Sequence, residues 1–205
     1  MSISALQKNW RQKYDCVPQQ LEKVKKVHSA ATAFNTNIDA VLKISGKRLS
    51  ELIETVNLNE EEFSNSRTLL ETPQDVVHGI TKCFSRGIAE EWICDDKVVY
   101  EWMQQNLGYN RLQMGGQGGI VANALAVLGV QNVFVHTNSH PKLQAQQFLP
   151  LDNLLGIDEN DKACRACDID RAAETPLVHW IIEFDIGDSF MAWGKEFICP
   201  KSNRF

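Results

Sequence analysis

The sequence predicts an α/β layered domain joined to a smaller β-rich part. Helical and strand-like segments alternate along most of the chain, which is typical of layered α/β domains. A glycine-rich turn at residues 115–119 directly precedes an apolar run, which predicts a largely buried helix over residues 119–128. Residues 177–198 alternate apolar and polar side chains and predict a β hairpin joined at residues 185–188. Such a hairpin differs from a parallel core and is expected to form a separate lid.

Composition sets the broad class. The chain has 205 residues, of which 43% are hydrophobic and 23% charged, an ordinary balance for a globular domain with a real core. The net charge of −5 argues against nucleic acid or an anionic membrane as the main partner. No apolar run approaches the roughly 20 residues that span a bilayer, and the first residues lack the apolar core of a signal peptide. We therefore expect a cytoplasmic protein.

The cysteine pattern gives little sign of a metal. Six cysteines are scattered along the chain, and Cys164 and Cys167 are the only close pair. One such pair without a second Cys or His pair is a weak zinc signal. Reduced thiols are the simpler interpretation, and we expect no metal there.

The first half of the chain changes character near Ser29. A helical stretch precedes it, and the small apolar residues that follow predict a central strand over residues 30–37. Asn35, Asn37 and Asp39 then form a polar loop before a second short strand. Asn and Asp at the carboxyl end of a strand are where open α/β sheets hold ligands. These residues also favour simple turns, so both interpretations stay open.

The glycine turn has two interpretations as well. Its glycines allow close backbone approach, and they lie at a helix N-terminus, where free N–H groups are available to a ligand. Gln117 adds an amide that donates and accepts hydrogen bonds, which suits an uncharged, polyhydroxylated ligand such as a sugar. The spacing matches neither a dinucleotide fingerprint nor a P-loop. The alternative is a turn that only lets a helix pack closely on a strand.

An adjacent acidic pair follows the next helix. Thr72 and Pro73 are expected to begin that helix and Gly87 to end it. Glu90 and Glu91 come soon afterwards, and adjacent carboxylates cannot both point the same way. One of them is therefore a candidate to face a cleft, and the alternative is two exposed acids.

Three segments together resemble one family. They are Ala-Phe-Asn-Thr-Asn-Ile-Asp-Ala at residues 33–40, Met-Gly-Gly-Gln-Gly-Gly-Ile-Val-Ala-Asn at residues 114–123, and His-Trp-Ile-Ile-Glu-Phe at residues 179–184 with the terminal Asn-Arg-Phe. In this order they resemble the ADP-dependent glucokinase and ADP-dependent phosphofructokinase family of the ribokinase-like superfamily. The resemblance covers roughly residues 30–205. Gly118 stands where the family usually has alanine, a small departure.

The resemblance implies a Rossmann-like, ribokinase-type three-layer domain with a small β-rich lid inserted in pieces. On that basis residues 1–29 would be an N-terminal helical segment, and residues 30–176 part of the large domain with a short lid strand near 40–46. Residues 177–198 would be the lid hairpin, and residues 199–205 would return to the large domain, with the chain incomplete at its C-terminus.

The resemblance also implies sugar contacts. Asn37 and Asp39 would hydrogen-bond sugar hydroxyls, as would Gly116 and Gln117 from the glycine turn. His179 on the lid would close over the sugar. These residues, far apart in sequence, are expected to converge on one cleft.

Substrate choice is implied by two further positions. A glutamate of the Glu90–Glu91 pair would bind the hydroxyl that distinguishes glucose, and Glu91 is preferred for its distance from Gln117. Arg204 matches a position that could meet the phosphate of fructose 6-phosphate, which suits an arginine fork. Dual use of the two sugars, or a preference for the phosphorylated one, is expected.

The implied reaction is phosphoryl transfer from ADP to a sugar hydroxyl, assisted by Mg²⁺ and an aspartate base. The family's base lies in a Gly-x-Gly-Asp motif near the C-terminus, and this chain has none, because Gly187-Asp188 comes too early. The base is expected beyond Phe205, so the chain resembles the N-terminal, sugar-binding half of a kinase, inactive alone. The alternative is a non-catalytic sugar-binding or interaction protein with the same fold. The oligomeric state stays open.

Overall fold

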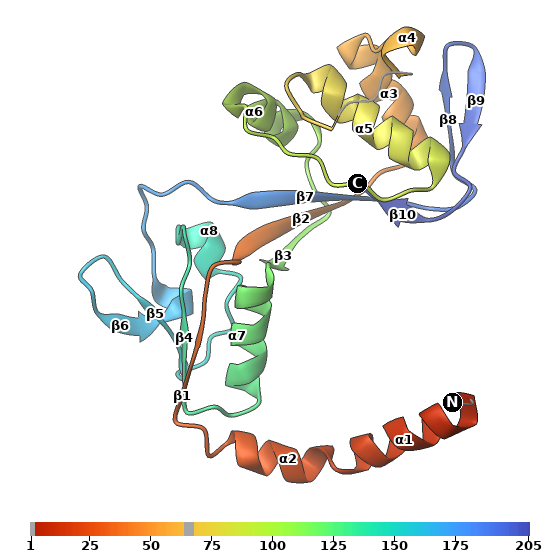
Figure 1. Ribbon diagram of the computed structural model, residues 1–205. Helices are drawn as coiled ribbons and strands as arrows, with labels where there is room; N and C mark the ends of the chain where they lie inside the picture. The colour runs from red at the N-terminus through yellow and green to blue at the C-terminus, as the bar shows by residue number, and fades with distance from the viewer. Residues whose placement is uncertain (1–2, 64–67) are drawn as a thin grey trace. The chain divides into compact units, whose positions relative to one another are not determined.

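A computed structural model describes residues 3–63 and 68–205, and the chain forms two compact units (Figure 1). Unit 1 comprises Met1–Ile38 and Met114–Val178, and unit 2 comprises Asp39–Gln113 and His179–Phe205. This division differs from the expected boundaries, since residues 47–113 lie with residues 179–205 rather than in the larger α/β part. Within the described ranges, no helix has both the length and the apolar character needed to cross a membrane.

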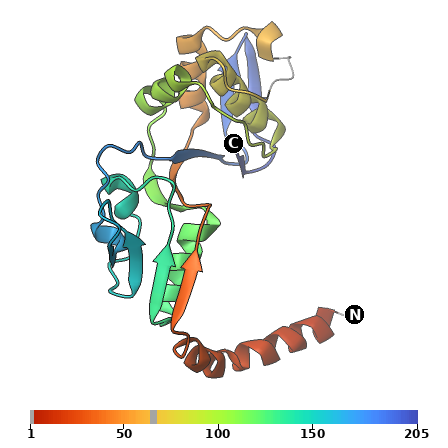
Figure 2. The same cartoon turned by 60° about the vertical axis from the view of Figure 1, so that its left-hand side comes forward.

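Unit 1 is built on a four-stranded sheet with the order β1-β4-β5-β6. Its strands are β1 (Ser29–Thr32), β4 (Asn132–Val135), β5 (Leu154–Ile157) and β6 (Ala163–Arg165). β4 is parallel to β1 and to β5, whereas β6 is antiparallel to β5. Figure 2 shows β1 beside β4 at the edge of this sheet.

The central strand expected over residues 30–37 is therefore wrong in two respects. β1 ends at Thr32 and, among the described strands, lies at a sheet edge rather than in the middle. The chain leaves the sheet at Phe34, whose φ of 74° is incompatible with a strand. It re-enters extended structure only at Asn37.

The helices of unit 1 differ in how much of their own surface is buried. They are α1 (Ile3–Asp15), α2 (Val17–Val24), α7 (Gln117–Val127), α8 (Lys142–Ala145) and a 3₁₀ turn, η1 (Ala166–Asp168). α7 packs Ala122 and Ala126 into a core that contains Val133 and Leu154 of the sheet. The expectation of a largely buried helix is wrong, because the sheet covers only one side of α7 and Val127 is 64% exposed.

Unit 2 contains a second four-stranded sheet and a hairpin. The sheet order is β10-β7-β2-β3, and β8 pairs with β9. The strands are β2 (Asn37–Lys43), β3 (Arg111–Gly115), β7 (Val178–Phe184), β8 (Ser189–Ala192), β9 (Lys195–Ile198) and β10 (Asn203–Arg204).

The hairpin expected over residues 177–198 is corrected by these pairings. β7 lies between β2 and β10, and the true hairpin is β8–β9, in which Ala192 faces Lys195. Its two-residue turn is Trp193-Gly194, with φ values of 51° and 71°. Two consecutive positive φ values match the right-handed twist of the flanking strands. Trp is an unusual residue at a turn position with positive φ. The sequence pattern therefore predicted the turn at residues 185–188 instead.

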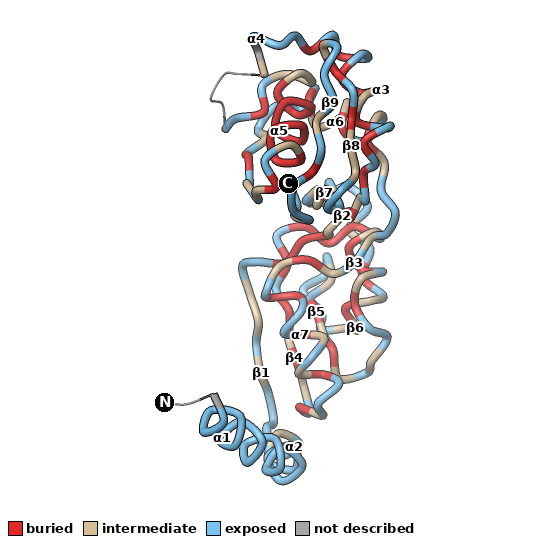
Figure 3. Tube along the Cα trace, turned by 90° about the vertical axis from the view of Figure 1, so that its right-hand side faces the viewer, coloured by how far each residue is buried: buried red, intermediate tan, exposed pale blue. Residues whose placement is uncertain are grey.

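The helices of unit 2 surround a central one. They are α3 (Gly46–Val56), α4 (Glu60–Phe63), α5 (Pro73–Arg86) and α6 (Lys97–Asn106). Every residue of α5 from Asp75 to Phe84 is buried, as Figure 3 shows. Its predicted ends are confirmed: Thr72 and Asp75 form a capping box, and Gly87 closes the helix in the left-handed conformation.

The backbones of α3 and β8 approach each other closely in unit 2. A Cβ built on Gly46 would lie 1.7 Å from the backbone oxygen of Ser189, and the Gly46 N–H donates to Asp188 Oδ2 over 2.9 Å. Phe190, the next residue of β8, is buried and packs at a ring distance of 5.5 Å from Phe84 of α5. The missing side chain at Gly46 therefore lets the hairpin reach the core of the unit.

Gly46→Ala should destabilise unit 2 by about 3 kcal/mol, because the added methyl group must displace backbone rather than a flexible side chain. The measurement is a urea unfolding curve followed by tryptophan fluorescence. Lys47→Ala, at the neighbouring exposed helix position, is the matched control and should change the midpoint little. An unchanged midpoint for Gly46→Ala would show that β8 moves away without cost.

Candidate functional site

The glycine turn of unit 1 packs directly against the polar loop that follows β1. Gly116 has a φ of 72°, and a Cβ there would lie 2.5–2.6 Å from Asn35 oxygens and 2.6 Å from Asn37 Oδ1. The Gly118 N–H donates to the Asn35 backbone oxygen over 2.7 Å. Two segments about 80 residues apart in sequence thus meet in unit 1, with Asn37 lying against Gly116.

The close packing accounts for most of the glycines in the turn. A Cβ on Gly118 would approach Thr36 Oγ1 to 3.0 Å, and one on Gly119 would lie 2.2 Å from Met114 Sδ. These contacts therefore support the interpretation in which the glycines let the helix pack closely against its neighbours. Gln117 is different, because it is the first residue of α7 and is exposed to solvent. Packing explains the glycines but not this amide.

Two of the expected unit 2 residues share one face of its sheet. Side chains alternate along a strand, and Ile182 and Phe184 of β7 are buried in the core. His179 and Glu183 therefore point to the opposite face. Arg204 of β10 lies directly across from Glu183 in the antiparallel register and so projects from the same face. His179 and Arg204 are both exposed.

Asp39 belongs to this face as well. On β2, the next strand along from β7, Leu42 packs against the core cluster, as does Ile44 just after the strand. Asp39 is out of phase with both and projects from the opposite face, where it is half-buried. The strands thus carry Asp39, His179 and Arg204 to a single surface of unit 2.

Glu90 and Glu91, although adjacent in sequence, lie in different surroundings. Glu90 Oε2 accepts one hydrogen bond from Lys82 Nζ and a second from Trp92 Nε1, each over 2.8 Å. The Lys82 side chain is only 10% exposed and lies 5.3 Å from the centre of the Trp92 ring. Glu91, by contrast, is exposed. Only Glu90 is held in a defined position.

The charge state of Glu90 follows from these contacts. Partial burial by itself raises the pKa of the Glu90 carboxyl, but the hydrogen bonds from Lys82 and Trp92, with the nearby charge of Arg86, hold the net pKa below its usual value. The neighbouring Cys83 responds in the opposite way, because burial raises the pKa of its thiol to about 12. Glu90 is therefore ionised at neutral pH, with Oε1 making no hydrogen bond to the described residues.

Sequence reasoning missed Lys82. It lies in the middle of the buried run of α5, between Thr81 and Cys83. A lysine inside an otherwise apolar helix is rarely buried unless it is paired. The lysine inside this helix, together with Glu90 just beyond the helix end, could have predicted the ion pair from the sequence.

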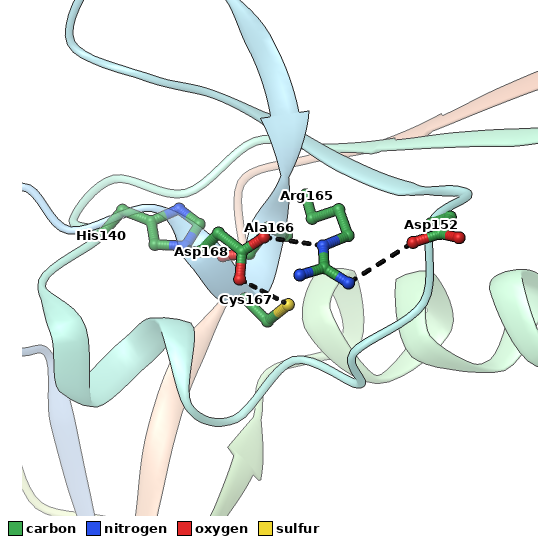
Figure 4. Close-up of polar contacts among 6 residues, drawn as sticks. All are labelled: His140, Asp152, Arg165, Ala166, Cys167 and Asp168. Carbon is green, nitrogen blue, oxygen red and sulfur yellow. Dashed lines mark hydrogen bonds and ion pairs between the residues drawn. The ribbon is translucent and has the colours of Figure 1, made fainter.

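A second polar cluster lies around η1 in unit 1 (Figure 4). Arg165 donates from Nε to Asp168 Oδ2 over 2.7 Å, and its Nη1 lies 3.4 Å from Asp152. The Cys167 thiol donates to Asp168 Oδ1, and burial raises the pKa of Cys167. Burial likewise raises the pKa of Cys164. Thiols that stay protonated are poor metal ligands and poor nucleophiles.

The described residues contain no group of three or more His, Cys, Asp or Glu side chains that could hold a metal ion. Because Mg²⁺ is usually held by only one or two protein carboxylates together with substrate phosphates and water, this finding assigns the ion implied by the resemblance to no particular residue.

Comparison with solved structures defines the class of protein. The last common ancestor of ADP-dependent phosphofructokinases from Methanosarcinales superposes with a TM-score of 0.75 and 30% identity, over 100% of this chain and 42% of that one. An ADP-dependent kinase in complex with fructose-6-phosphate and ADPβS gives a TM-score of 0.71 and 27% identity, over 100% of this chain and 39% of that one. The fold is a mixed α/β fold of the ribokinase-like type.

Sequence relatives then give the family. Residues 28–205 match the conserved region of ADP-specific phosphofructokinase/glucokinase, and the chain belongs to this family. The ADP-specific phosphofructokinase of Thermococcus kodakarensis is 29% identical over 92% of this chain, and the ADP-dependent glucose/glucosamine kinase of Pyrococcus abyssi is 31% identical over 96%. The chain spans 42% and 43% of these relatives' own lengths.

The ion pair predicts how unit 2 responds to acid. The pKa of Glu90 is lower in the folded chain than in the unfolded chain, so its contribution to stability is complete above the ordinary glutamate pKa and is lost as the pH falls through the folded value. Glu90→Gln should therefore lower stability at pH 7 and reduce the further loss between pH 5 and pH 3. Urea midpoints at several pH values measure both effects. Glu91→Gln should keep the wild-type pH dependence, and equal curves for the two variants would contradict the assignment.

Proposed function

We propose that this chain is the sugar-binding portion of an ADP-dependent sugar kinase that phosphorylates glucose or fructose 6-phosphate. One observation carries the proposal: the family match over residues 28–205 includes the loop at Asn35–Asn37 and the glycine turn, and these two segments pack together in unit 1. The relatives' names support both sugars, since one acts as a phosphofructokinase and another as a glucose/glucosamine kinase.

In unit 1 the sugar contacts we propose are Asn37, Gly116 and Gln117. The exposed Gln117 amide supplies both a donor and an acceptor, and the start of α7 supplies backbone N–H groups. The Gln117 amide both donates and accepts, as a sugar hydroxyl does, and carries no charge. This fits a part of the site that reads the sugar ring rather than a charged substituent.

In unit 2 we propose that Asp39, His179 and Arg204 contact the substrate from their shared sheet face. Asp39 accepts hydrogen bonds from sugar hydroxyls, and His179 can donate or accept one. Arg204 presents a planar fork of donors that matches phosphate geometry. The solved relative bound to fructose-6-phosphate shows that such a ligand occurs among proteins of this fold.

Between the two glutamates, the contacts favour Glu90 over Glu91. Lys82 and Trp92 bind one carboxylate oxygen and leave Oε1 as an acceptor on a side chain that is 28% exposed. An acceptor held in one position loses little entropy when a hydroxyl binds it. The preference for Glu91, which rested on its distance from Gln117 in sequence, has no comparable structural support.

The chemistry proposed for the complete kinase is transfer of the β-phosphoryl group of ADP to a sugar hydroxyl. A bond forms between the hydroxyl oxygen and phosphorus, the bond to AMP breaks, and a base accepts the hydroxyl proton. Within this chain we assign no residue to the base and none to Mg²⁺. The proposed role of these residues is to bind and orient the sugar.

Glu90→Gln should weaken sugar binding by about 5- to 150-fold, because a buried hydrogen-bond partner that loses its match costs roughly 1–3 kcal/mol. Glu91→Gln is the matched control and should bind like the wild type. Ligand-observed NMR titration with glucose and with fructose 6-phosphate, on residues 1–205, gives both affinities. The reverse order of effects would return the role to Glu91.

Arg204→Leu should separate the two sugars. Removal of the guanidinium should weaken fructose 6-phosphate by about tenfold or more and leave glucose nearly unchanged, because only the former carries a phosphate. The same titration measures both. Equal losses for the two sugars would place Arg204 outside the phosphate contact, and binding of neither sugar by the wild type would defeat the proposal.

Residues 1–205 alone should form no sugar phosphate from ADP and Mg²⁺. We assign binding groups to this chain but assign neither the base nor a nucleotide site to it. A coupled assay with each sugar measures the product directly. Turnover at ordinary enzyme rates, roughly 1–10³ s⁻¹, would show that the catalytic base lies within this chain.

A further inference from the structure

Two backbone hydrogen bonds set the register between β2 and β7. The Ile38 N–H donates to the Leu177 oxygen and the Ile44 N–H to the Glu183 oxygen, each over 2.9 Å. Residue numbers rise together along the two strands, so the strands are parallel and Ile44 lies beside Phe184. The offset is the same at both bonds, and the register therefore holds along the whole pair.

The outer face of this sheet, which is the face opposite the core of unit 2, is ordered in rows across the strands (Figure 1). In the first row Asp39 lies beside His179, and in the second row Val41 lies beside Ile181. Val41 is only 2% exposed although it belongs to neither core cluster, and Ile181 is half-buried. A polar row is therefore followed by an apolar row on the same surface.

The third row of the outer face carries charges. Lys43 lies on one side of Glu183, and Arg204 lies on the other, directly across the antiparallel pair. Lys43 Nζ pairs with Asp185 Oδ2 over 2.5 Å, and this contact raises the pKa of Lys43, with a smaller contribution from the charge of Glu183. Within residues 3–63 and 68–205, by contrast, Arg204 makes no ion pair. Arg204 is therefore the cation of this row that is available to an anionic ligand.

The spacing of the rows matches one kind of ligand. The first and third rows are four residues apart along β7, which separates their backbones by about 13 Å. Side chains of a strand lean along its direction, and the long Arg204 side chain can shorten this span. A ligand that contacts all three rows needs hydroxyl groups at one end, carbon in the middle and an anion at the other end. A hexose phosphorylated on its terminal carbon presents its groups in this order.

We infer that the sugar lies along β7 on the outer face, with the C–H side of its ring on Ile181 and any phosphate directed toward Arg204. Asp39 and His179 bind hydroxyl groups at the opposite end. The inference rests on the proposed function and extends it, because it gives the ligand an orientation and makes Ile181 a further specificity-determining residue. The Ile181 side chain forms no hydrogen bond, and its role is to remove ring carbons from water.

The charges of the third row support this orientation. The Glu183 carboxylate repels a phosphate, and Asp185 already occupies Lys43, so the middle of the row and its β2 side are unfavourable for an anion. The β10 side, where Arg204 lies, remains. A neutral sugar such as glucose gains nothing from Arg204 and depends on the first two rows alone.

The direct test is NMR spectroscopy of residues 1–205 with methyl-labelled isoleucine and unlabelled fructose 6-phosphate. Ring protons of the bound sugar should show NOEs to the Ile181 Cδ1 methyl group. They should show none to Ile198, an isoleucine of β9 that is 57% exposed and serves as the control. In a sample with labelled arginine, the protons on the phosphorylated carbon should show NOEs to Arg204.

Substitutions at Ile181 test the energetic role. Ile181→Thr keeps a branched strand former but replaces apolar surface with a hydroxyl, and it should weaken glucose and fructose 6-phosphate alike by about 5- to 10-fold. Ile181→Val keeps the apolar surface and should bind both sugars within about twofold of the wild type. Met191→Thr, at a 57% exposed position of β8, is the matched control and should change neither affinity. The affinities come from ligand-observed titrations.

Three results would overturn the inference while the wild type still binds sugar. They are a bound sugar without NOEs to Ile181, NOEs that place the phosphorylated carbon beside His179 instead of Arg204, and wild-type affinities for both sugars in Ile181→Thr. Each of them leaves the proposed function standing. Binding of neither sugar by the wild type is a different outcome, because it defeats the proposed function and this inference together.

Discussion

The contact between the Asn35–Asn37 loop and the glycine turn constrains the rest of unit 1. A Cβ at Gly116 or Gly118 would collide with loop atoms at 2.5–3.1 Å. The loop sets where β1 ends and β2 begins, and the turn sets where α7 starts. Because α7 and β1 both pack against β4, this close approach constrains how both of them lie on the sheet.

Local chemistry made much of the fold predictable. The ends of α5 followed from Thr72, Pro73 and Gly87, which are helix-start and helix-stop signals. Long-range pairing was not predictable in this way. β7 joins strands distant in sequence, and the turn at Trp193-Gly194 carries no strong residue signal. The exposure of α7 was not predicted, because an apolar composition indicates that a helix is covered. It does not indicate which segment covers the helix.

The candidate site shows the same limit. Motif resemblance placed Asn37 and Gln117, and the structure adds that Asn37 lies against the turn. Within the Glu90–Glu91 pair the resemblance preferred Glu91, whereas the contact that favours Glu90 comes from Lys82 on a different element. Adjacent residues of identical type are separable only by their three-dimensional partners.

The burial of α5 has a consequence for thiol chemistry. Cys83 has no exposed surface, and its raised pKa keeps the sulfur protonated, so in the native state it is shielded both sterically and electronically. A thiol-specific reagent can then react with it only when α5 separates from its neighbours. The rate at which Cys83 is modified therefore reports how often unit 2 opens. The exposed Cys16 reports the intrinsic reactivity of the reagent toward a thiol in the same molecule.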